Sequence, residues 1–454
     1  MKLRPKAQAA AAHAAPAGPE LGDALAQAIG HLRSERLDEA GAALQRILRR
    51  WPDQTDALHY LGLWHHTQGR VDEGVALMRQ SLRLLPAQFS TWNNLGNVLL
   101  LAQRVDEAAQ AYAQAVEHAP GAIDGAMALN NLGLLHRKLR RLDDSEAAFR
   151  RALELQPDYA DAWYNLAETL VQLGRIPEGL IAHSKARVLW PADQQPRSDV
   201  IRSLMLLNER ERAAVLLREW LAEDADNPVA QHMLAACEGG NTPDRASDGY
   251  VEQVFDQFSA SFDAKLEALG YRAPELVAQA LQTVAAPTAA SLDIVDAGCG
   301  TGLCGPLLQP WARRLAGCDL SDGMLRQAKL RQVYSALHKA ELTHYLHTQP
   351  AAFDAVVSAD TLCYFGPLGA VLAAAHRCLR PGGWLVFTVE ALPEGHAQPH
   401  LLQGNGRYAH AHDYLARALP AAGYDHVTLK QDRLRMEGGL PVMGWVVTAQ
   451  RPAA

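Results

Sequence analysis

Five prolines recur at an almost constant interval in the first half of this chain, and this period constrains its fold more than any other feature. Pro52, Pro86, Pro120, Pro157 and Pro191 are separated by 34, 34, 37 and 34 residues. Such a period is typical of arrays in which one supersecondary unit stacks on the next. Because a proline just past a helix stops that helix, we expect each interval to hold one helical hairpin.

Other positions repeat together with the prolines. Leu-Gly pairs recur at matching places in Leu61-Gly62, Leu95-Gly96 and Leu132-Gly133. Residues 104–118 and 141–155 carry small and large apolar residues at helical spacing. The pattern resembles tetratricopeptide repeats, in which a Trp, a Leu-Gly pair, an Ala and a Pro lie at fixed offsets. The resemblance implies an α-helical solenoid over residues 21–238, and we expect residues 1–20 to form a disordered tail.

Asparagines cluster in the expected first helices of these repeats. They are Asn93, Asn94, Asn97, Asn130, Asn131 and Asn165. The resemblance implies a concave groove in which such side chains hold a protein or peptide partner. Simple stacking together with self-association into a homo-oligomer explains the repeats equally well, and both interpretations stay open.

The pattern changes in the second half of the chain. A cluster of Gly, Pro, Asp and Ser over residues 239–249 predicts a linker. Beyond it, over residues 250–454, short apolar runs alternate with helical segments, as in a sheet with helices on both faces. The expected strands are 292–296, 314–319, 353–358 and 384–390, followed by a terminal hairpin of 426–434 and 442–450.

A glycine-rich turn follows the first of these strands. Residues 296–302 read DAGCGTG, Asp319 closes the next strand, and residues 379–383 read LRPGG before a later one. These motifs, in this order, resemble class I S-adenosylmethionine-dependent methyltransferases. The resemblance implies a Rossmann-like, seven-stranded methyltransferase domain that uses S-adenosyl-L-methionine.

A dinucleotide site is the competing interpretation of the same turn. Gly300, Gly302 and Gly305 satisfy GxGxxG, and Asp319 lies near the expected offset. Pro306 directly after this motif and the terminal antiparallel hairpin favour the methyltransferase interpretation.

The resemblance implies nine cofactor-binding residues. They are Asp296, Gly298, Gly300, Gly302, Asp319, Leu320, Met324, Glu341 and Leu342. The glycines would approach the methionine part, Asp296 would anchor its ammonium through water, and Asp319 would hold the ribose hydroxyls. Glu341 stands where the family pattern has Asp, so a solvated charge at a helix end is the alternative for it.

Four further residues are candidates for the catalytic end of the site. Asp360 and Tyr364 follow the strand over 353–358, where related enzymes line the acceptor site. We expect residues 404–410, which include Arg407 and His410, to form a Gly-rich loop leading into a helix, and a histidine there could act as general base near neutral pH. The alternative for His410 is a cap at the start of a helix.

Composition excludes several function classes. The net charge is −7, and Lys plus Arg number 26 against 30 acidic residues up to residue 240 and 17 against 20 beyond it, so we expect no nucleic-acid partner. No apolar run approaches the length of a membrane span, and we expect a cytoplasmic protein without a membrane partner. Six cysteines show no CxxC pair, so we expect reduced thiols and no metal.

These observations lead to three functional hypotheses. The first is a methyltransferase whose protein or peptide acceptor is positioned by the repeats. The second is a small-molecule methyltransferase whose repeats serve assembly, and the third is a non-catalytic scaffold with a cofactor-binding fold. Residues 255–262 (FDQFSASF) resemble the lid found ahead of such domains in bacterial repeat-bearing methyltransferases, although an amphipathic packing helix would have the same pattern.

Overall fold

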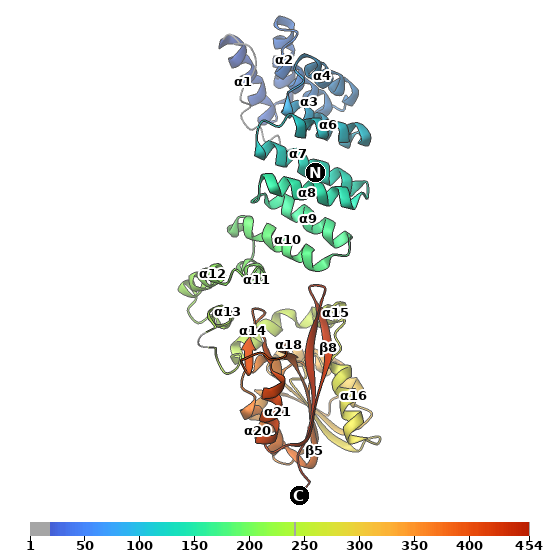
Figure 1. The fold of residues 1–454 in the computed structure, drawn as a ribbon, viewed down its shortest axis with the longest axis vertical. Helices are drawn as coiled ribbons and strands as arrows, with labels where there is room; N and C mark the ends of the chain where they lie inside the picture. Colours follow the sequence, from blue (N-terminus) through green and yellow to red (C-terminus); the bar gives the residue numbers. More distant parts are fainter. Residues whose placement is uncertain (1–18, 240–241, 454) are drawn as a thin grey trace. The chain divides into compact units, whose positions relative to one another are not determined.

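The chain divides into two compact units, Met1–Trp190 (unit 1) and Pro191–Ala454 (unit 2), in a computed structural model that describes residues 19–239 and 242–453 (Figure 1). Residues 1–18 of the tail expected over residues 1–20 lie outside the described residues. The first described helix begins at Pro19.

Unit 1 is a stack of antiparallel helix pairs. Its described helices are α1 (Pro19–Arg33), α2 (Leu37–Arg50), α3 (Thr55–Thr67), α4 (Val71–Leu84), α5 (Phe89–Leu101), α6 (Val105–Glu117), α7 (Ala122–Lys138), α8 (Leu142–Leu155), α9 (Ala160–Gln172) and α10 (Ile176–Leu189). Each odd-numbered helix packs against the next one along the chain, and each pair packs against the following pair. The predicted helical solenoid is confirmed.

The glycines of the Leu-Gly pairs explain how the two helices of a repeat approach each other. A Cβ at Gly96 would lie 2.6 Å from the ring of Tyr112, and one at Gly133 would lie 2.7 Å from the ring of Phe149. Both rings are buried. In these two repeats an aromatic ring of the second helix occupies the space beside the glycine, which fixes the spacing of the helices. At Gly62 a Cβ would instead lie 2.8 Å from the Gly74 carbonyl oxygen and from the Met78 side chain.

The turn within each helix pair also repeats. A left-handed residue stands in the turn in each case: Glu35, Gly69, Gln103, Arg140, Gly174 and Asn208. The last of these joins two helices of unit 2, α11 (Arg197–Leu206) and α12 (Arg210–Glu223). The repeat geometry thus continues past Pro191, where the sequence motifs fade.

The asparagines expected to hold a peptide are hydrogen-bonded within the solenoid. Three contacts join successive repeats: Asn94 Nδ2 to His59 Nε2 at 2.9 Å, Asn131 Nδ2 to Asn93 Oδ1 at 2.9 Å, and Asn165 Nδ2 to Asn130 Oδ1 at 3.0 Å. Within one repeat, Asn97 accepts a hydrogen bond of 2.7 Å from the Tyr112 hydroxyl. Stacking of the repeats therefore accounts for these side chains without a ligand.

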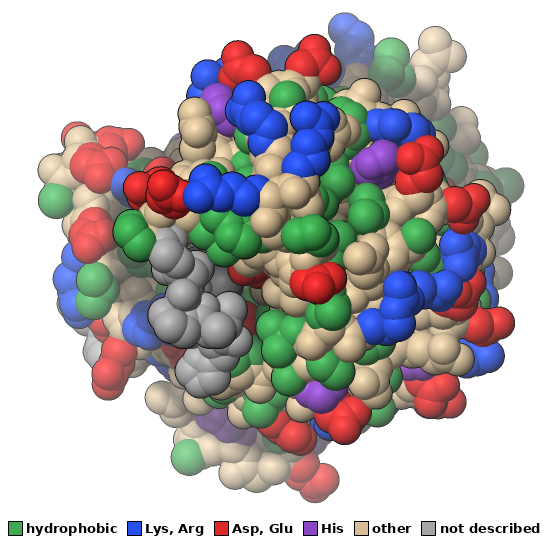
Figure 2. Space-filling view, turned by 90° about the horizontal axis from the view of Figure 1, so that it is seen from above, with side chains coloured by type: hydrophobic (Ala, Val, Ile, Leu, Met, Phe, Trp, Pro, Cys, Tyr) green, Lys and Arg blue, Asp and Glu red, His purple; other side chains and the backbone are tan. Residues whose placement is uncertain are grey.

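Exposed charged side chains of both signs form ion pairs on the surface of the solenoid. On the face seen in Figure 2, basic and acidic groups are interspersed rather than separated by sign. Many form pairs between successive repeats, such as Arg104 with Asp72 at 3.1 Å and Arg175 with Glu146 at 2.7 Å. Exposed pairs of this kind contribute little individually.

Unit 2 begins with helices and continues as an α/β domain. Its helical elements are η1 (Ala192–Gln194), α11, α12, α13 (Pro228–Glu238), α14 (Asp248–Phe258), η2 (Ser259–Ser261), α15 (Phe262–Ala268), α16 (Ala273–Ala285), α17 (Gly305–Leu308), α18 (Asp322–Leu330), α19 (Leu342–His347), η3 (Leu362–Tyr364), α20 (Gly369–Cys378) and α21 (His412–Ala421). Its strands are β1 (Leu292–Ala297), β2 (Ala312–Asp319), β3 (Ala336–Lys339), β4 (Phe353–Ser358), β5 (Leu379–Ala391), β6 (His400–Leu402), β7 (Tyr408–His410), β8 (Asp425–Glu437) and β9 (Leu440–Gln450).

The sheet of unit 2 is parallel over β3-β2-β1-β4-β5 and ends in the antiparallel hairpin of β8 and β9, with β9 paired to β5. This arrangement confirms the predicted α/β domain and its terminal hairpin. The described sheet has nine strands rather than the expected seven. The additional two form the short hairpin β6–β7, which extends β5 through Glu390 and Ala391. Residues 404–410 were expected to form a loop.

Helices cover both faces of this sheet (Figure 1). Alternate residues of the central strands point to opposite faces, as strand geometry requires. Ile294 packs with α16, whereas the next residue, Val295, packs in the cluster that contains α19, α20 and α21. This layering leaves the carboxyl ends of β1, β2 and β4 at one edge, where open α/β sheets bind their ligands.

Two expectations on chain organisation need separate comment. The solenoid was expected to extend to residue 238, with a linker at residues 239–249, whereas contacts group α11–α13 with unit 2. Within the expected linker, residues 240–241 lie outside the described part and α14 begins at Asp248. That domain boundary stays a prediction. Among the described residues, no helix combines the length and the apolar character needed to cross a membrane.

Candidate functional site

A cavity of about 140 Å³ lies at the carboxyl ends of β1, β2 and β4. A second hollow of about 50 Å³ adjoins it. The two share lining residues: Val251, Gly298, Asp319, Thr361 and Tyr364. They therefore form one continuous site with a larger and a smaller compartment.

The glycine-rich turn after β1 forms the floor of this site. Gly298 has a φ of +73°, and a Cβ there would lie 2.3 Å from the side chain of Thr361. The Thr361 hydroxyl donates a hydrogen bond of 3.0 Å to the Gly298 carbonyl. Gly300 has a φ of +53° with open space where a Cβ would stand. Both glycines line the larger compartment, so a ligand can approach the backbone closely.

Gly302 belongs to the same turn but lines neither compartment. Its φ is +83°, and a Cβ there would meet the ring of Tyr334 at 2.9 Å. The structure thus gives Gly302 a packing role, in contrast to the expected contact with a cofactor.

Asp319, at the end of β2, lines both compartments. Its Oδ2 accepts a hydrogen bond of 2.8 Å from the Gly300 amide, and its Oδ1 accepts one of 2.9 Å from the Ser321 amide. Burial raises the pKa of this carboxyl. These two amides fix the orientation of the carboxylate, and each oxygen keeps a lone pair for a ligand hydroxyl.

Asp296 lies beneath the turn rather than in the cavity wall. It is 1% exposed, and its Oδ2 accepts a hydrogen bond of 2.6 Å from the Tyr334 hydroxyl. Its Oδ1 is buried and has no hydrogen-bond partner among the described residues. Burial raises the pKa of this carboxyl to about 7. Since Asp296 lines neither compartment, any action on a ligand is through the turn above it.

The smaller compartment contains the remaining expected cofactor residues except Met324, which lines the larger one. Leu320 and Leu342 supply apolar walls, and Glu341 lies beside them. Glu341 is also the N-cap of α19, because its carboxylate accepts hydrogen bonds from the amides of Thr343 and His344 at 3.0 and 2.8 Å. Glu341 therefore caps α19 and also lines the smaller compartment.

The segment α14–α15 covers the larger compartment, as the resemblance implied for residues 255–262. Its apolar side chains in the wall are Val251, Phe255, Phe262, Leu266 and Leu269. Asp256 accepts hydrogen bonds from the Ser321 hydroxyl at 2.5 Å and the Gly323 amide at 2.9 Å. Asp263 accepts one of 2.5 Å from the Thr301 hydroxyl. Two carboxylates thus fasten an apolar cover to the turn and to the start of α18.

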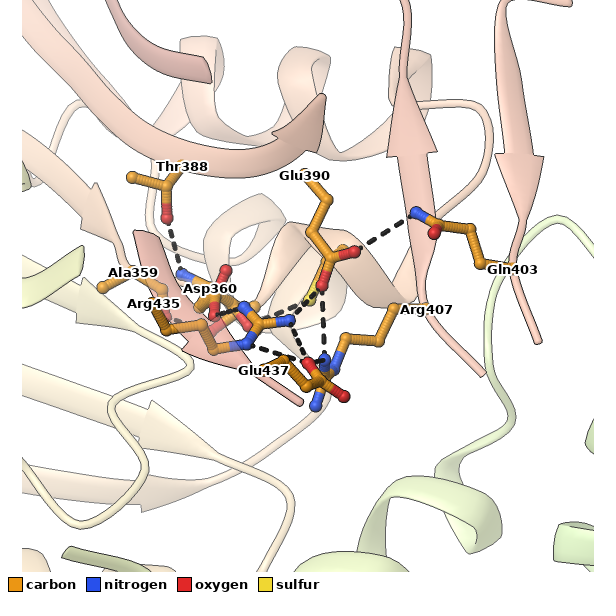
Figure 3. A network of polar contacts seen from close by, with 10 residues as sticks. Ala359, Asp360, Thr388, Glu390, Gln403, Arg407, Arg435 and Glu437 are labelled. Atoms are coloured by element: carbon orange, nitrogen blue, oxygen red, sulfur yellow. Dashed lines mark hydrogen bonds and ion pairs between the residues drawn. The ribbon is translucent and has the colours of Figure 1, made fainter. Parts of the chain in front are cut away.

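At the other end of the cavity, three of the four expected catalytic residues come together. Asp360, Tyr364 and Arg407 line the larger compartment, and so does Arg435, which sequence reasoning missed. Figure 3 shows Arg435 at the centre of a polar network. Its Nη1 lies 2.7 Å from Asp360 Oδ2, and its Nη2 is hydrogen-bonded to Glu390.

Arg407 enters the same network from the turn between β6 and β7. Its Nη1 lies 3.3 Å from Glu390 Oε1 and 3.1 Å from Glu437 Oε2 (Figure 3). Glu437 also lies 3.3 Å from Arg435. Glu390 and Arg435 are buried, whereas Arg407 is partly exposed and the Glu437 side chain is 41% exposed. The cluster therefore has a buried centre and an exposed edge, and each charge has a partner.

His410 does not belong to the cavity. Its side chain is fully buried, its Nε2 is 2.9 Å from the Gly366 carbonyl oxygen, and burial lowers its pKa to about 4. A general base must reach the proton that it removes. This placement contradicts the expected role of His410 as a base and also the alternative of a helix-start cap, because its ring contacts the segment after η3.

The cysteines near the turn are buried packing residues. Cys299, Cys304 and Cys318 are all buried. Burial raises the pKa of each thiol, and a protonated thiol is a poor nucleophile. The cavity chemistry therefore depends on carboxylates, hydroxyls and guanidinium groups.

Comparisons with known proteins agree with this geometry. A methyltransferase domain family matches residues 295–387, and tetratricopeptide repeat families match residues 25–89, 88–158 and 130–193. Methyltransferase-like protein 27 of Homo sapiens is 33% identical over 168 residues, which cover 34% of this chain and 68% of that protein.

Two bacterial relatives carry more specific names. The ubiquinone biosynthesis O-methyltransferase of Thiobacillus denitrificans is 28% identical over 32% of this chain and 63% of its own length. The malonyl-[acyl-carrier protein] O-methyltransferase of Pseudescherichia vulneris is 35% identical over 23% of this chain and 42% of its own length. The chain thus spans less than two thirds of either bacterial relative.

Proposed function

This chain belongs to the class I methyltransferases and carries tetratricopeptide repeats ahead of its methyltransferase domain, and on this premise we propose that it transfers a methyl group from S-adenosyl-L-methionine to an acceptor in the larger compartment. The observation that carries the proposal is the position of Asp319. Its carboxylate stands at the junction of the two compartments, beside a glycine turn that leaves room for a ligand.

The residues present fit this cofactor in several respects. The Asp319 carboxylate suits a ribose diol, because each oxygen can accept a further hydrogen bond. Leu320 and Leu342 suit the faces of an adenine ring, and Glu341 offers an acceptor at its edge. Gly298 and Gly300 would lie against the methionine part. When bound, S-adenosyl-L-methionine supplies a methyl carbon attached to a positively charged sulfur.

The protein's own contribution is positioning and exclusion of water. The cover formed by α14–α15 places Phe255 and Phe262 in the cavity wall. The network around Arg435 holds Asp360 and Arg407 rigidly at the acceptor end. Holding an acceptor and a donor in a reactive geometry lowers the barrier without covalent participation by the protein.

We further propose that the acceptor is a protein or peptide and that the repeats position it. The support is architectural: a solenoid of stacked helical hairpins presents an extended surface, and a small acceptor would not require one. The asparagines of successive repeats are engaged with one another, so a bound peptide would use their remaining lone pairs and neighbouring side chains.

The cofactor site can be tested by calorimetry with S-adenosylhomocysteine. Replacing Asp319 with Ala removes two hydrogen bonds to a charged group, each worth about 1.5–3 kcal/mol, and should weaken binding by at least about 100-fold. Asp322→Ala is the matched control, because Asp322 is exposed three residues away and pairs with Lys339 at 2.7 Å. Equal affinity of Asp319→Ala and Asp322→Ala would place the cofactor elsewhere.

The acceptor class can be tested with methyl-labelled S-adenosyl-L-methionine and a bacterial lysate. Size fractionation of the products should place the label in macromolecules. Label found only in small molecules would refute the protein or peptide acceptor and favour repeats used for assembly. Cofactor binding without any transfer of label would favour a non-catalytic scaffold.

A further inference from the structure

Asp360 has an unusual backbone for a residue in the wall of the site. It follows β4 with a φ of +56°, a left-handed conformation that non-glycine residues rarely adopt. Its amide donates a hydrogen bond of 2.9 Å to the Thr388 hydroxyl, which holds it in place. Such strain costs about 1–3 kcal/mol and persists where the surrounding structure imposes it, often at functional sites.

The carboxylate of Asp360 is only half satisfied. Oδ2 is paired with Arg435 at 2.7 Å. Oδ1 is buried and has no hydrogen-bond partner among the described residues. Buried polar atoms are nearly always paired, and the Asp360 side chain is 14% exposed and lines the larger compartment. An unpaired oxygen on such a side chain indicates a place for a donor from a ligand.

The neighbouring guanidinium groups are already paired with carboxylates. Arg435 contacts Asp360, Glu390 and Glu437, and Arg407 contacts the last two (Figure 3). Three carboxylates therefore face two guanidinium groups, and the cluster has one negative charge in excess when all are ionised. A ligand carboxylate placed beside Asp360 would meet repulsion, whereas a hydroxyl or an amine would satisfy Oδ1.

We infer that the methyl acceptor is a group that donates a hydrogen bond, a hydroxyl or an amine, and that Asp360 accepts its proton. This inference rests on the proposed methyl transfer and specifies its substrate class. It separates this chain from the relative that is named for methylating a malonyl group on acyl-carrier protein.

The atoms balance without a further reactant. A bond forms between the acceptor oxygen or nitrogen and the methyl carbon. The bond between that carbon and sulfur breaks, and its electron pair stays on sulfur. The acceptor's proton passes to Asp360 Oδ1, from which it reaches solvent after the product leaves.

Several groups determine the proton affinity of Asp360. Burial raises its pKa, Arg435 and Arg407 lower it, and Glu390 and Glu437 raise it. Tyr271 and Cys363 are further titratable groups that interact electrostatically with Asp360. A carboxylate with a raised pKa is a stronger base than an exposed one, so the rate of transfer should rise with pH as Asp360 ionises.

The first test uses the stability of the labelled product to alkali. Methyl-labelled S-adenosyl-L-methionine is incubated with the full-length protein and fractions of a bacterial lysate, and the products are treated with base. Ethers and methylamines keep their label, whereas methyl esters release it as volatile methanol. Base-stable label that mass spectrometry locates on oxygen or nitrogen supports the inference, whereas base-stable label on carbon or sulfur overturns it. Release as methanol overturns the inference but leaves the proposed methyl transfer intact, and absence of any transfer refutes both.

The second test uses substitutions at Asp360. Asp360→Asn should lower kcat about 100-fold or more, the usual contribution of a general base, with the affinity for S-adenosylhomocysteine changed less than twofold. Asp360→Glu should recover part of the rate, and the rise of rate with pH should be lost in Asp360→Asn. Asp425→Asn, at an exposed aspartate of β8, is the matched control. An unchanged kcat, or a loss in Asp360→Asn that keeps the wild-type pH profile, would overturn the role of Asp360.

Discussion

Replacing Asp296 with Asn should stabilise unit 2 in a pH-dependent manner. The Asp296 carboxyl is 1% exposed, and burial raises its pKa from an ordinary 3.8 to about 7. Its Oδ1 has no partner among the described residues, and its Oδ2 accepts from Tyr334. Asn retains an acceptor for that hydroxyl but carries no charge, so the substitution isolates the cost of a buried ionised carboxylate.

The magnitude follows from linkage between protonation and folding. Because the folded pKa lies above the unfolded one, the contribution of this group to stability is complete below pH 3.8 and is lost as the pH rises to about 7. A shift of about 3 units at about 1.36 kcal/mol each is about 4 kcal/mol above pH 7. Between pH 5 and pH 7 alone the loss is about 3 kcal/mol. The amide of Asn adds a buried donor, but its cost does not change with pH.

The measurement is a urea titration at pH 5 and pH 8 followed by hydrogen-exchange mass spectrometry of peptides from β1 and β4. These peptides report on unit 2 without interference from the solenoid. The advantage of Asp296→Asn over the wild type should be about 3 kcal/mol larger at pH 8 than at pH 5. Asp425→Asn, exposed on β8, should show no such difference. An equal effect of Asp296→Asn at both pH values would refute a raised pKa at this site.

Two further substitutions test packing and charge. Gly133→Ala should destabilise unit 1 in thermal unfolding, because overpacking against the Phe149 ring costs about 1–3 kcal/mol and exceeds the ~1 kcal/mol gain in helix propensity. The control Gly30→Ala, in open space on α1, should be neutral or stabilising. Equal effects of the two substitutions on the melting temperature would contradict this account. Arg435→Met should destabilise unit 2 by about 3–5 kcal/mol in urea, because it leaves Asp360 and its neighbours as uncompensated buried charges; a loss below about 1 kcal/mol would show that the cluster is not ionised.

The order of elements was predictable because it depends on local sequence. The proline period, the Leu-Gly pairs and the apolar runs each report on their own segment, and the strands β1, β2, β4 and β5 appear where those runs lie. The smaller strands were missed for the same reason. β6 and β7 span three residues each, which is too short for an alternating pattern to emerge.

The position of Arg435 shows where local reasoning fails. Strict alternation along β8 would place Leu434 and Arg435 on opposite faces, yet both are buried. The pairing of β8 with β9 shifts register between Arg433 and Arg435, and such a bulge redirects the following side chain. β8 also carries Lys430, Asp432 and Arg433, so nothing in the sequence distinguishes Arg435 from a solvent-facing arginine.

His410 and the asparagine ladder fail for a different reason. The residue types and their sequence context correctly predicted that these polar side chains form hydrogen bonds. They did not predict which groups are the partners. The Gly366 carbonyl that bonds His410 is 44 residues away in sequence, and Asn165 bonds Asn130 of the preceding repeat. Both partners are set by tertiary structure, so sequence chemistry alone overestimates the number of groups that remain free for a ligand.

Asp360, by contrast, keeps one carboxylate oxygen without a partner among the described residues, although the rest of the residue is held by hydrogen bonds. Arg435 pairs with the other carboxylate oxygen and Thr388 accepts from the amide, while the backbone is left-handed. The turn that carries Arg407 contacts α13, because His232 Nε2 lies 2.9 Å from the Gly406 carbonyl oxygen. Removing residues up to 238 would therefore disturb the acceptor end itself, and the role of the repeats has to be separated from the chemistry by substitutions within unit 1.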